Sequence, residues 1–347
     1  MSQVNDIFSR CITQYLAQTG ELPASLQQLL QLSTTRLLDS EMLIEDSFEP
    51  MAALSEPRVN QPLESFEQTI FIDQLTAEVE QNGFGDKFHT IIGLFGSIMI
   101  ELTGSDEQKA NVQQWVNDGI FGHFLMTDAG GPNLANWKTQ LQPTDDGFTL
   151  SIDKKWGIEG QNLGFVMVVC QQQGKPFPLT VLVDPVKCKA LEASACGGSY
   201  LDGKLQLGNV KGNIMVSKSD LMNKGGLGSV NRFLTLVRPR FVKCLMNHVL
   251  WLASQDRLTL NATDRDNIAF MKQAADWCIS QTNFSIHSVD RVLSLKFASN
   301  EILLDLVTKG AVKDVADQRD LLGFTKMEGS SYRCLFEVYS KFKRGRR

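Results

Sequence analysis

The chain has 347 residues, of which 43% are hydrophobic, and 34 lysines and arginines against 39 aspartates and glutamates give a net charge of -5. This length allows two or three domains, or one large helical assembly, with a sizeable core. A mildly acidic chain without a basic face is a poor candidate for nucleic-acid binding. Seven cysteines, none in a CxxC pair, argue against a disulfide framework or a zinc site and are typical of reduced thiols in a cytosolic protein.

The N-terminus has no basic region followed by an apolar one, so no secretory signal is expected. The most apolar stretch, Ile91–Ile100, is too short to span a bilayer and is interrupted by glycine and serine. The histidines are dispersed and lie in no metal-ligand spacing. We therefore expect a cytoplasmic protein without a membrane span and without a metal site.

Residues 1–118 are predicted to form an N-terminal helical domain, because apolar side chains recur three and four positions apart. Leu26, Leu29 and Leu30 are one example of this spacing. The stretch Pro50–Pro62 is richer in proline and serine and is predicted to be a loop.

Residues 119–220 change to an alternating or continuous β-branched pattern, which predicts a small all-β domain. Turn-forming residues such as Asp145–Gly147 separate the apolar runs. The strand-like runs are Phe148–Ile152, Phe165–Val169 and Leu179–Val183.

Residues 221–347 return to the helical period and are predicted to form a C-terminal helical domain. A second apolar stripe in this domain is a candidate for burial between subunits. Its residues are Ile302, Leu303, Leu306 and Val307. The basic tail Lys341–Arg347 is interpreted as a solvated end.

Five segments resemble, in the same order, motifs of the acyl-CoA dehydrogenase family. They are Thr103–Lys109 (F-G-T-x-E-Q-K in the family), Phe124–Gly130 (F-A-L-T-E-P-G), Lys154–Trp156 (K-x-W-I-T-N), Ile214–Met222 (V-x-V-P-x-x-x-L-L), and Arg319–Asp320 followed by Glu328–Ser331 (R-D-x7-E-G-T-S). Each motif alone is weak, but five in order with matching changes of periodicity are hard to reach by chance.

The resemblance implies an α+β fold with an N-terminal helical domain, a central β domain of two packed sheets and a C-terminal helical bundle. It also implies FAD, bound between the β domain and the C-terminal helices. The reaction would be α,β-dehydrogenation of an acyl thioester to the trans-2-enoyl thioester, as in fatty acid metabolism. The thioester would be carried on CoA or on an acyl or peptidyl carrier protein, the electron acceptor is left open, and the assembly would be a homodimer or a tetramer built as a dimer of dimers.

Thr127 and the loop after it are candidates for flavin contacts. A hydroxyl and free backbone N–H groups beside Gly130 and Gly131 suit hydrogen bonds to a flavin edge or a pyrophosphate, whereas the simpler interpretation is a strand-ending turn. The resemblance favours the flavin. The loop departs from the family at Pro132, where a serine usually helps hold the substrate, so the substrate contact at Pro132 and Asn133 is in doubt.

Trp156 matches the tryptophan that packs against the flavin ring, a task that suits a flat indole. Ile158 stands where the family has a threonine hydrogen-bonded near flavin N5, so that polar contact is lost. Arg257 loosely matches an arginine that reaches the FAD pyrophosphate of a neighbouring subunit, although an ion pair with a carboxylate is an equal alternative. The family's adenosine-contacting motif has no convincing counterpart here.

Glu328 matches the catalytic base of the family. Such a base removes the substrate α-proton, which requires a carboxylate whose pKa is raised by exclusion of water. Gly329 would allow close approach of substrate, and Ser330 stands where the family has a threonine that contacts the cofactor. The alternative is that Ser330 or Ser331 only caps the last helix and that Glu328 is exposed.

Two further interpretations stay open. The chain could be a degenerate, non-catalytic member that serves as a structural subunit of a heteromeric complex, an idea that Ile158 supports and Glu328 opposes. It could also be a flavin oxidase that uses oxygen as the acceptor.

Overall fold

The computed structural model describes residues 10, 12–39, 51–54, 68–85, 87–131, 133–201, 203–222, 226–281 and 283–345. Contacts divide the chain into two compact units. The first, here called the helical unit, contains Met1–Ile44, Asp73–Phe84 and Leu234–Arg347. The second, the β unit, contains Glu45–Ile72 and Gly85–Phe233.

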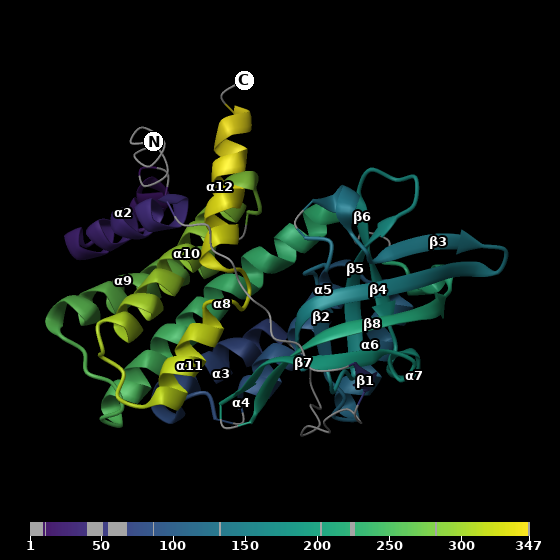
Figure 1. Cartoon of the computed structure of the whole chain (residues 1–347), viewed down its shortest axis with the longest axis horizontal. Helices are drawn as coiled ribbons and strands as arrows, with labels where there is room; N and C mark the ends of the chain where they lie inside the picture. Colours follow the sequence, from purple (N-terminus) through teal and green to yellow (C-terminus); the bar gives the residue numbers. More distant parts are fainter. Residues whose placement is uncertain are drawn as a thin grey trace. The chain divides into compact units, whose positions relative to one another are not determined.

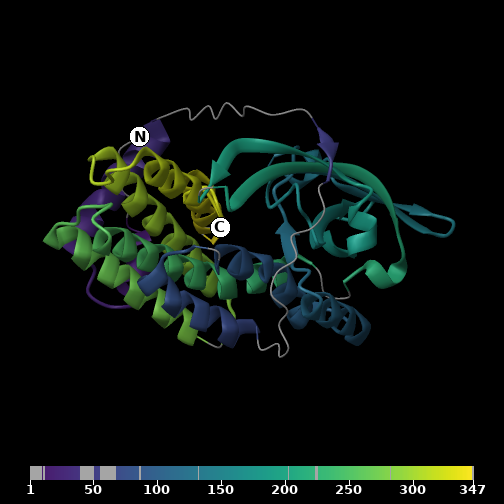
Figure 2. The same cartoon turned by 90° about the horizontal axis from the view of Figure 1, so that it is seen from below.

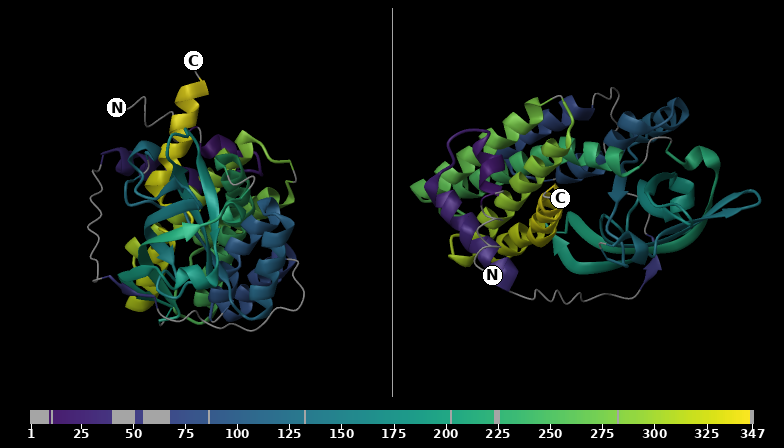
Figure 3. Two further views of the ribbon diagram at one scale, coloured as in Figure 1. Left: turned by 90° about the vertical axis from the view of Figure 1, so that its right-hand side faces the viewer. Right: turned by 90° about the horizontal axis from the view of Figure 1, so that it is seen from above.

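The helical unit is built around α10, which is buried along most of its length and contacts α2, α9, α11 and α12. Figures 1 and 2 show α9 and α10 side by side, and Figure 3 shows α12, in yellow, near them. The helices are α2 (Ala24–Asp39), α3 (Gln68–Asn82), α8 (Leu227–Ser254), α9 (Ala262–Ser280), α10 (Ile286–Thr308), α11 (Val315–Phe324) and α12 (Ser331–Gly345), of which the first residues of α3 and α8 belong to the β unit.

The starts of α9 and α10 are set by side chains that satisfy the first backbone N–H groups. The Asn261 side chain accepts from Asp264 N at 2.9 Å, and the Asp264 carboxylate accepts from Asn261 N at 3.1 Å. Ser285 and Ser288 form the same reciprocal pair at the start of α10. These local bonds fix where each helix enters the bundle.

The apolar stripe predicted for a subunit interface lies mostly inside the helical unit instead, with only Val307 partly exposed. Ile302, Leu303 and Leu306 are at most 4% exposed, because α10 is surrounded by other helices of the same chain. The stripe therefore gives no argument for an oligomer.

The β unit contains an eight-stranded mixed sheet in its described part, with four helices beside it. Its strand order is β1-β7-β8-β4-β3-β5-β2, and β6 pairs with β5. The strands are β1 (Ala52–Ala53), β2 (Gly122–Leu125), β3 (Gln140–Thr144), β4 (Gly147–Ile158), β5 (Phe165–Gln172), β6 (Pro178–Val183), β7 (Glu192–Tyr200) and β8 (Leu205–Val216). The helices are α4 (Lys87–Gly93), α5 (Phe95–Thr103), α6 (Asp106–Asn117) and α7 (Pro185–Cys188), with short 3-10 turns η1 (Leu134–Asn136) and η2 (Lys218–Asp220).

The two sheets expected from the sequence are joined into one hydrogen-bonded path. The joint is a short parallel pairing of β3 with β5, in which Gln140 lies opposite Gln171 and Leu141 opposite Gln172. The long strands β7 and β8 pair along their length and curve together (Figure 2). One apolar core is shared by β4, β5, β6 and β8, so the packing of strand on strand that the sequence predicts is present within a single curved sheet.

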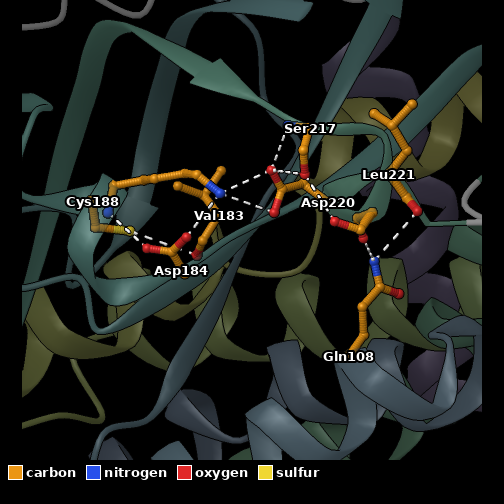
Figure 4. A network of polar contacts seen from close by, with 9 residues as sticks. Gln108, Val183, Asp184, Cys188, Ser217, Asp220 and Leu221 are labelled. Carbon is orange, nitrogen blue, oxygen red and sulfur yellow. Dashed lines mark hydrogen bonds and ion pairs between the residues drawn. The ribbon is translucent and has the colours of Figure 1, made fainter. Parts of the chain in front are cut away.

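Two of the sequence motifs meet in the β unit, where they form a structural joint (Figure 4). Gln108 caps the start of α6 through its bond to Ser105, and its Nε2 donates to Ser219 O at 2.8 Å and to Leu221 O at 3.3 Å. Lys187 bridges the Asp184 and Asp220 carboxylates next to this joint. These motif residues therefore hold the backbone of the β unit together.

The predicted boundaries near 118 and 220 fall between α6 and β2 and between η2 and α8, where the secondary structure changes. Contacts nevertheless place α2 and most of α3 in one unit with the C-terminal helices, and α4, α5 and α6 in the β unit. The three-domain division stays a prediction. Among the described helices, none has the length and apolar character needed to cross a membrane.

Candidate functional site

The segment that carries Glu328 is a tight turn between α11, which ends at Phe324, and α12, which begins at Ser331. Glu328 has φ 55° and Gly329 has φ 123°, so two successive residues adopt left-handed backbone conformations. For a residue with a side chain this costs about 1 kcal/mol, which other contacts must offset. A Cβ at Gly329 would lie 2.9 Å from Cys334 Sγ, so glycine is required there by packing as well as by φ.

Three side chains hold this turn by its carbonyl oxygens. Arg238 Nε, from α8, donates to Glu328 O at 2.7 Å. Asn300 Nδ2 and Lys296 Nζ, both from α10, donate to Gly329 O at 3.0 Å and to Phe324 O at 3.1 Å. The turn is therefore fixed from two helices of the bundle, which is how a strained conformation persists.

The Glu328 carboxylate lies free of partners in this held turn. The residue is partly buried, and within the described ranges its carboxylate makes no ion pair or hydrogen bond. Burial raises the pKa of the Glu328 carboxyl above its ordinary value, and the charges of Arg238 and Lys296 oppose this rise without cancelling it. A positioned carboxylate with a raised pKa is suited to accept a proton.

Ser330 caps the last helix. Its hydroxyl accepts from Arg333 N at 3.4 Å, and Cys334 N donates to its carbonyl at 2.9 Å. This part of the capping alternative is present, but the exposed glutamate that accompanied it is not, since Glu328 is partly buried.

The loop after β2 is organised by Asp128, which is 4% exposed. Its carboxylate accepts from Gly130 N at 2.8 Å, from Lys138 N at 2.7 Å and from Thr139 N at 3.0 Å. The buried ammonium of Lys154, on β4, lies 3.3 Å from the same carboxylate. Burial alone would raise the pKa of Asp128, but these backbone bonds and the Lys154 charge together hold it below its ordinary value.

The backbone N–H groups that the sequence offered to a ligand are already hydrogen-bonded, to Asp128 within this loop and to Asp153 on strand β4. Ala129 N donates to Asp153 O at 3.0 Å, Gly130 N to the Asp128 carboxylate, and Gly131 N to Asp128 O at 3.0 Å. The Thr127 hydroxyl, in contrast, has no hydrogen-bond partner within the described part of the chain. The loop thus presents a hydroxyl rather than a cradle of amides.

Gly130 is required by the packing of this loop, whereas Gly131 is favoured only by its backbone conformation. A Cβ at Gly130 would lie 1.8 Å from Asn136 O, whereas a Cβ at Gly131, which has φ 85°, would meet nothing within 4 Å. Asn133 is exposed and caps η1 by accepting from Ala135 N at 3.1 Å. Pro132 lies outside the described residues.

Trp156 stands out from β4 at an irregularity in its pairing with β8. The register shifts between Lys154 and Gly157, and Trp156 has φ 54° with its N–H 3.4 Å from Asn209 Oδ1. The indole is 40% exposed, which is unusual for the largest apolar side chain. Ile158 returns to the ladder opposite Leu207.

Arg257 is engaged within its own chain. Its guanidinium makes a two-pronged ion pair with the buried Asp317, at 2.9 Å and 2.6 Å, and lies 5.6 Å from the Trp251 ring. This is the ion-pair alternative considered for Arg257. Its contact with a neighbouring subunit's cofactor stays a prediction.

Solved structures with the same arrangement include acyl-CoA dehydrogenases and an acyl carrier protein oxidase. Glutaryl-CoA dehydrogenase from Mycobacterium smegmatis, in complex with FADH2, matches with a TM-score of 0.58 and 16% identity over 80% of this chain and 79% of that one. Butyryl-CoA dehydrogenase from Megasphaera elsdenii matches with a TM-score of 0.61 and 11% identity, over 80% of this chain and 81% of that one. The prolyl acyl carrier protein oxidase AnaB matches with a TM-score of 0.60 and 12% identity, over 97% of this chain and 90% of that one.

The chain has an acyl-CoA dehydrogenase-like fold. The fold predicted from the five motifs is therefore confirmed. No protein-family model and no curated protein matches the sequence, so this likeness is one of structure.

The residues of this acyl-CoA dehydrogenase-like chain fit the ring of a flavin better than its pyrophosphate. The exposed indole of Trp156 and the unpartnered hydroxyl of Thr127 suit a flat aromatic ring with polar edges. The amides of Ala129, Gly130 and Gly131 are already hydrogen-bonded and would have to break those bonds to bind phosphate.

Three residues that matter for these turns were not assigned a role from the sequence. Asp128 was visible only as the acidic residue of a family motif, and Arg238 only as a basic residue next to a proline. Lys296 was hidden in an apolar helix, where a single lysine between buried neighbours is the one signal that could have marked it.

Proposed function

We propose that this protein catalyses FAD-dependent α,β-dehydrogenation of an acyl thioester carried on CoA or on a carrier protein. The observation that carries the proposal is the Glu328 turn: a carboxylate without partners, with a raised pKa, on a strained backbone that three side chains hold in place. A turn with only a structural purpose would have no need of an unpaired, partly buried carboxylate.

In this proposal Glu328 removes the α-proton of the thioester. Desolvation makes its carboxylate a stronger base than a glutamate in water, and the clamp on its backbone fixes where that carboxylate stands. Thr127 would hydrogen-bond the flavin edge and Trp156 would pack on the ring. FAD, when bound, supplies an acceptor for the hydride that leaves the β-carbon.

The test replaces the base and keeps its size. Glu328→Gln should bind FAD and remain yellow, but its rate of flavin reduction by a thioester should fall by about ten-thousand-fold or more, because general-base catalysis is lost. Stopped-flow absorbance in the flavin bands, with acyl-CoA and acyl-carrier-protein substrates, measures this rate.

Glu337→Gln is the matched control, since it makes the same chemical change at a carboxylate paired with Arg333 on α12. That variant should keep the wild-type rate. If Glu328→Gln also reduces flavin at the wild-type rate, Glu328 is not the base and the proposed mechanism is wrong.

A second candidate function, a non-catalytic subunit, is favoured by one observation. The loop amides that would meet a pyrophosphate are already bonded within the chain, and the Ile158 side chain offers no polar group. A purified protein that stays colourless, and gains no flavin absorbance when FAD is added, would establish this alternative over the enzymatic one.

Substrate carrier and acceptor form the finer part of the proposal. AnaB is described as a prolyl acyl carrier protein oxidase, which supports testing a carrier-protein thioester and oxygen alongside CoA esters and dye acceptors. Oxygen consumption without an added acceptor would identify an oxidase. We also propose a homodimer or a dimer of dimers, which light scattering tests directly.

A further inference from the structure

Lys296 is a charged residue in the interior of the helical unit. It lies on α10 with none of its surface exposed, and neither it nor Asn300, one helical turn later, reaches solvent. A buried ammonium destabilises the fold unless it is hydrogen-bonded or paired. Within the described ranges Lys296 has no carboxylate at ion-pair distance, so its placement needs another explanation.

The bonds of Lys296 and Asn300 explain it geometrically. Lys296 Nζ donates to Phe324 O at 3.1 Å and also to Asn300 Oδ1, and Asn300 Nδ2 donates to Gly329 O at 3.0 Å. Phe324 O marks the end of α11, and Gly329 follows Glu328 directly. Two residues four apart on one helix therefore grip both ends of the turn that presents Glu328.

We propose that Lys296 and Asn300 are positioning residues for Glu328: they hold the two ends of its turn, and the Lys296 side chain places a positive charge beside that turn. The inference rests on the proposed function, in which Glu328 is the base. Neither residue is assigned contact with substrate or cofactor.

The charged and titratable groups around Lys296 come from three elements. Arg238 lies on α8, Glu328 in the turn and Cys334 on α12, and the Phe241 ring of α8 lies 5.4 Å from Lys296 Nζ. Burial lowers the pKa of Lys296 to about 7, with Cys334 and Glu328 acting to raise it and Arg238 to lower it. Lys296 therefore changes charge near neutral pH, beside a carboxylate whose own pKa is raised.

A purely structural lysine and a positioning lysine differ in one measurable respect. If Lys296 only satisfies two oxygen atoms, its titration and that of Glu328 are independent. If its charge acts on Glu328, each group must shift the other's pKa in the opposite direction, because linkage is reciprocal.

The first measurement follows Lys296 itself, in protein without substrate. Lysine labelled with ¹³C at the ε position is observed by NMR across a pH titration, and Lys296→Arg identifies the Lys296 signal by its disappearance. Glu328→Gln should lower the Lys296 pKa, because the carboxylate that favours the ammonium is gone. Ser294→Ala, a change at another buried polar residue of α10, should leave that pKa where it was.

The second measurement follows Glu328 through the infrared band of its protonated carboxyl, isolated by subtracting the Glu328→Gln spectrum. Lys296→Met should shift the Glu328 pKa further upward, since a nearby positive charge is lost. Lys296→Arg should move the pKa back toward the wild-type value.

Asn300→Leu tests the geometric part. Releasing Gly329 O should lower kcat by about ten- to a hundred-fold and change KM little, because the base is displaced while the substrate contacts remain. The acidic limb of the kcat/KM profile should shift in Lys296→Met and not in Ser294→Ala.

Unchanged Lys296 titration in Glu328→Gln would overturn the inference, and that variant need not alter the fold. The titrations use no flavin or thioester, so the two proposals fail separately. If the two titrations are uncoupled but Glu328→Gln is inactive, the proposed function holds and the positioning inference is wrong. If they are coupled but the wild-type protein reduces no flavin, only the proposed function is wrong.

Discussion

Two buried lysines lie beside the two segments described above, the loop after β2 and the turn that carries Glu328. They differ in the groups that bind the ammonium. In the β unit, Lys154 lies 3.3 Å from the Asp128 carboxylate, and backbone N–H groups bond the same carboxylate. In the helical unit, Lys296 is bonded to neutral oxygens of Asn300 and Phe324, and the nearby Glu328 carboxylate is left unpaired.

The difference separates a carboxylate used for structure from one available for chemistry. The pKa of Asp128 is held below its ordinary value although burial acts to raise it, whereas burial raises the pKa of Glu328. An acid that is hydrogen-bonded on all sides stabilises its loop and accepts no proton near neutral pH. One that is desolvated and unpaired is ready to accept a proton.

The largest expected effect on stability comes from breaking the ion pair between Asp128 and Lys154. Asp128→Asn leaves Lys154 as an uncompensated buried charge, so the free energy of unfolding of the β unit should fall by about 3 to 5 kcal/mol. Urea denaturation, monitored by circular dichroism, measures the loss.

Asp153→Asn is the control for that variant, because Asp153 pairs with Lys211 at 3.7 Å near the surface and should contribute less than about 1 kcal/mol. A double variant, Asp128→Asn with Lys154→Met, should recover part of the loss. If Asp128→Asn is as stable as the wild type, the Asp128 carboxylate does not stabilise its loop.

Acid should weaken the helical unit before the β unit. His248 is packed among Phe84, Trp251 and Phe324, and burial, with help from Arg257, lowers its pKa to about 3. His248 therefore binds a proton at lower pH in the folded state than in the unfolded state. The free energy of unfolding should fall by about 3 kcal/mol from pH 7 to pH 4.

The Asp128 pair behaves differently over that range. Its carboxyl pKa is lowered, so its contribution is present above the ordinary aspartate range and is lost only at more acid pH. Calorimetry as a function of pH should show that the loss of stability between pH 7 and pH 4 disappears in His248→Gln. The loss should remain in His287→Gln, which alters an exposed histidine of α10. The same slope in both variants would contradict the assignment to His248.

The smallest effect on stability is expected at Trp156. Because the indole is 40% exposed, Trp156→Leu should change the free energy of unfolding by about 0.5 kcal/mol or less. If the ring packs on flavin, the same variant should weaken FAD binding by about tenfold. Fluorescence titration with FAD measures the affinity, and unchanged affinity would show that Trp156 does not contact the ring.

The sequence predicted the order of helical and β segments because hydrophobic periodicity is local. It also predicted the fold through motifs that the structure uses partly as joints, as with Gln108 and Leu221. It could not predict that Asp128 binds the N–H groups of Lys138 and Thr139, since those are brought to it by the path of the loop.

The burial of Lys296 was equally out of reach. A lysine in an amphipathic pattern is ordinarily solvated, and only the packing of several helices around α10 encloses it. The left-handed backbone of Glu328 was not predicted, because the conformation depends on Arg238 and Asn300. Non-local contacts decide both features.

The interleaving of the two units along the chain has a consequence for how the protein is made. Strands β2 to β8 are consecutive in the chain and end at Val216, so on the ribosome the β unit can acquire its sheet while the C-terminal helices are still unsynthesised. Helix α2, in contrast, contacts α9 and α10, and the Ser25 hydroxyl donates to Asn267 Oδ1 at 2.8 Å, a bond that can form only after α9 has been synthesised. The early helix therefore emerges with its apolar face uncovered, and chaperone binding during synthesis is expected at the N-terminal helices rather than at the sheet.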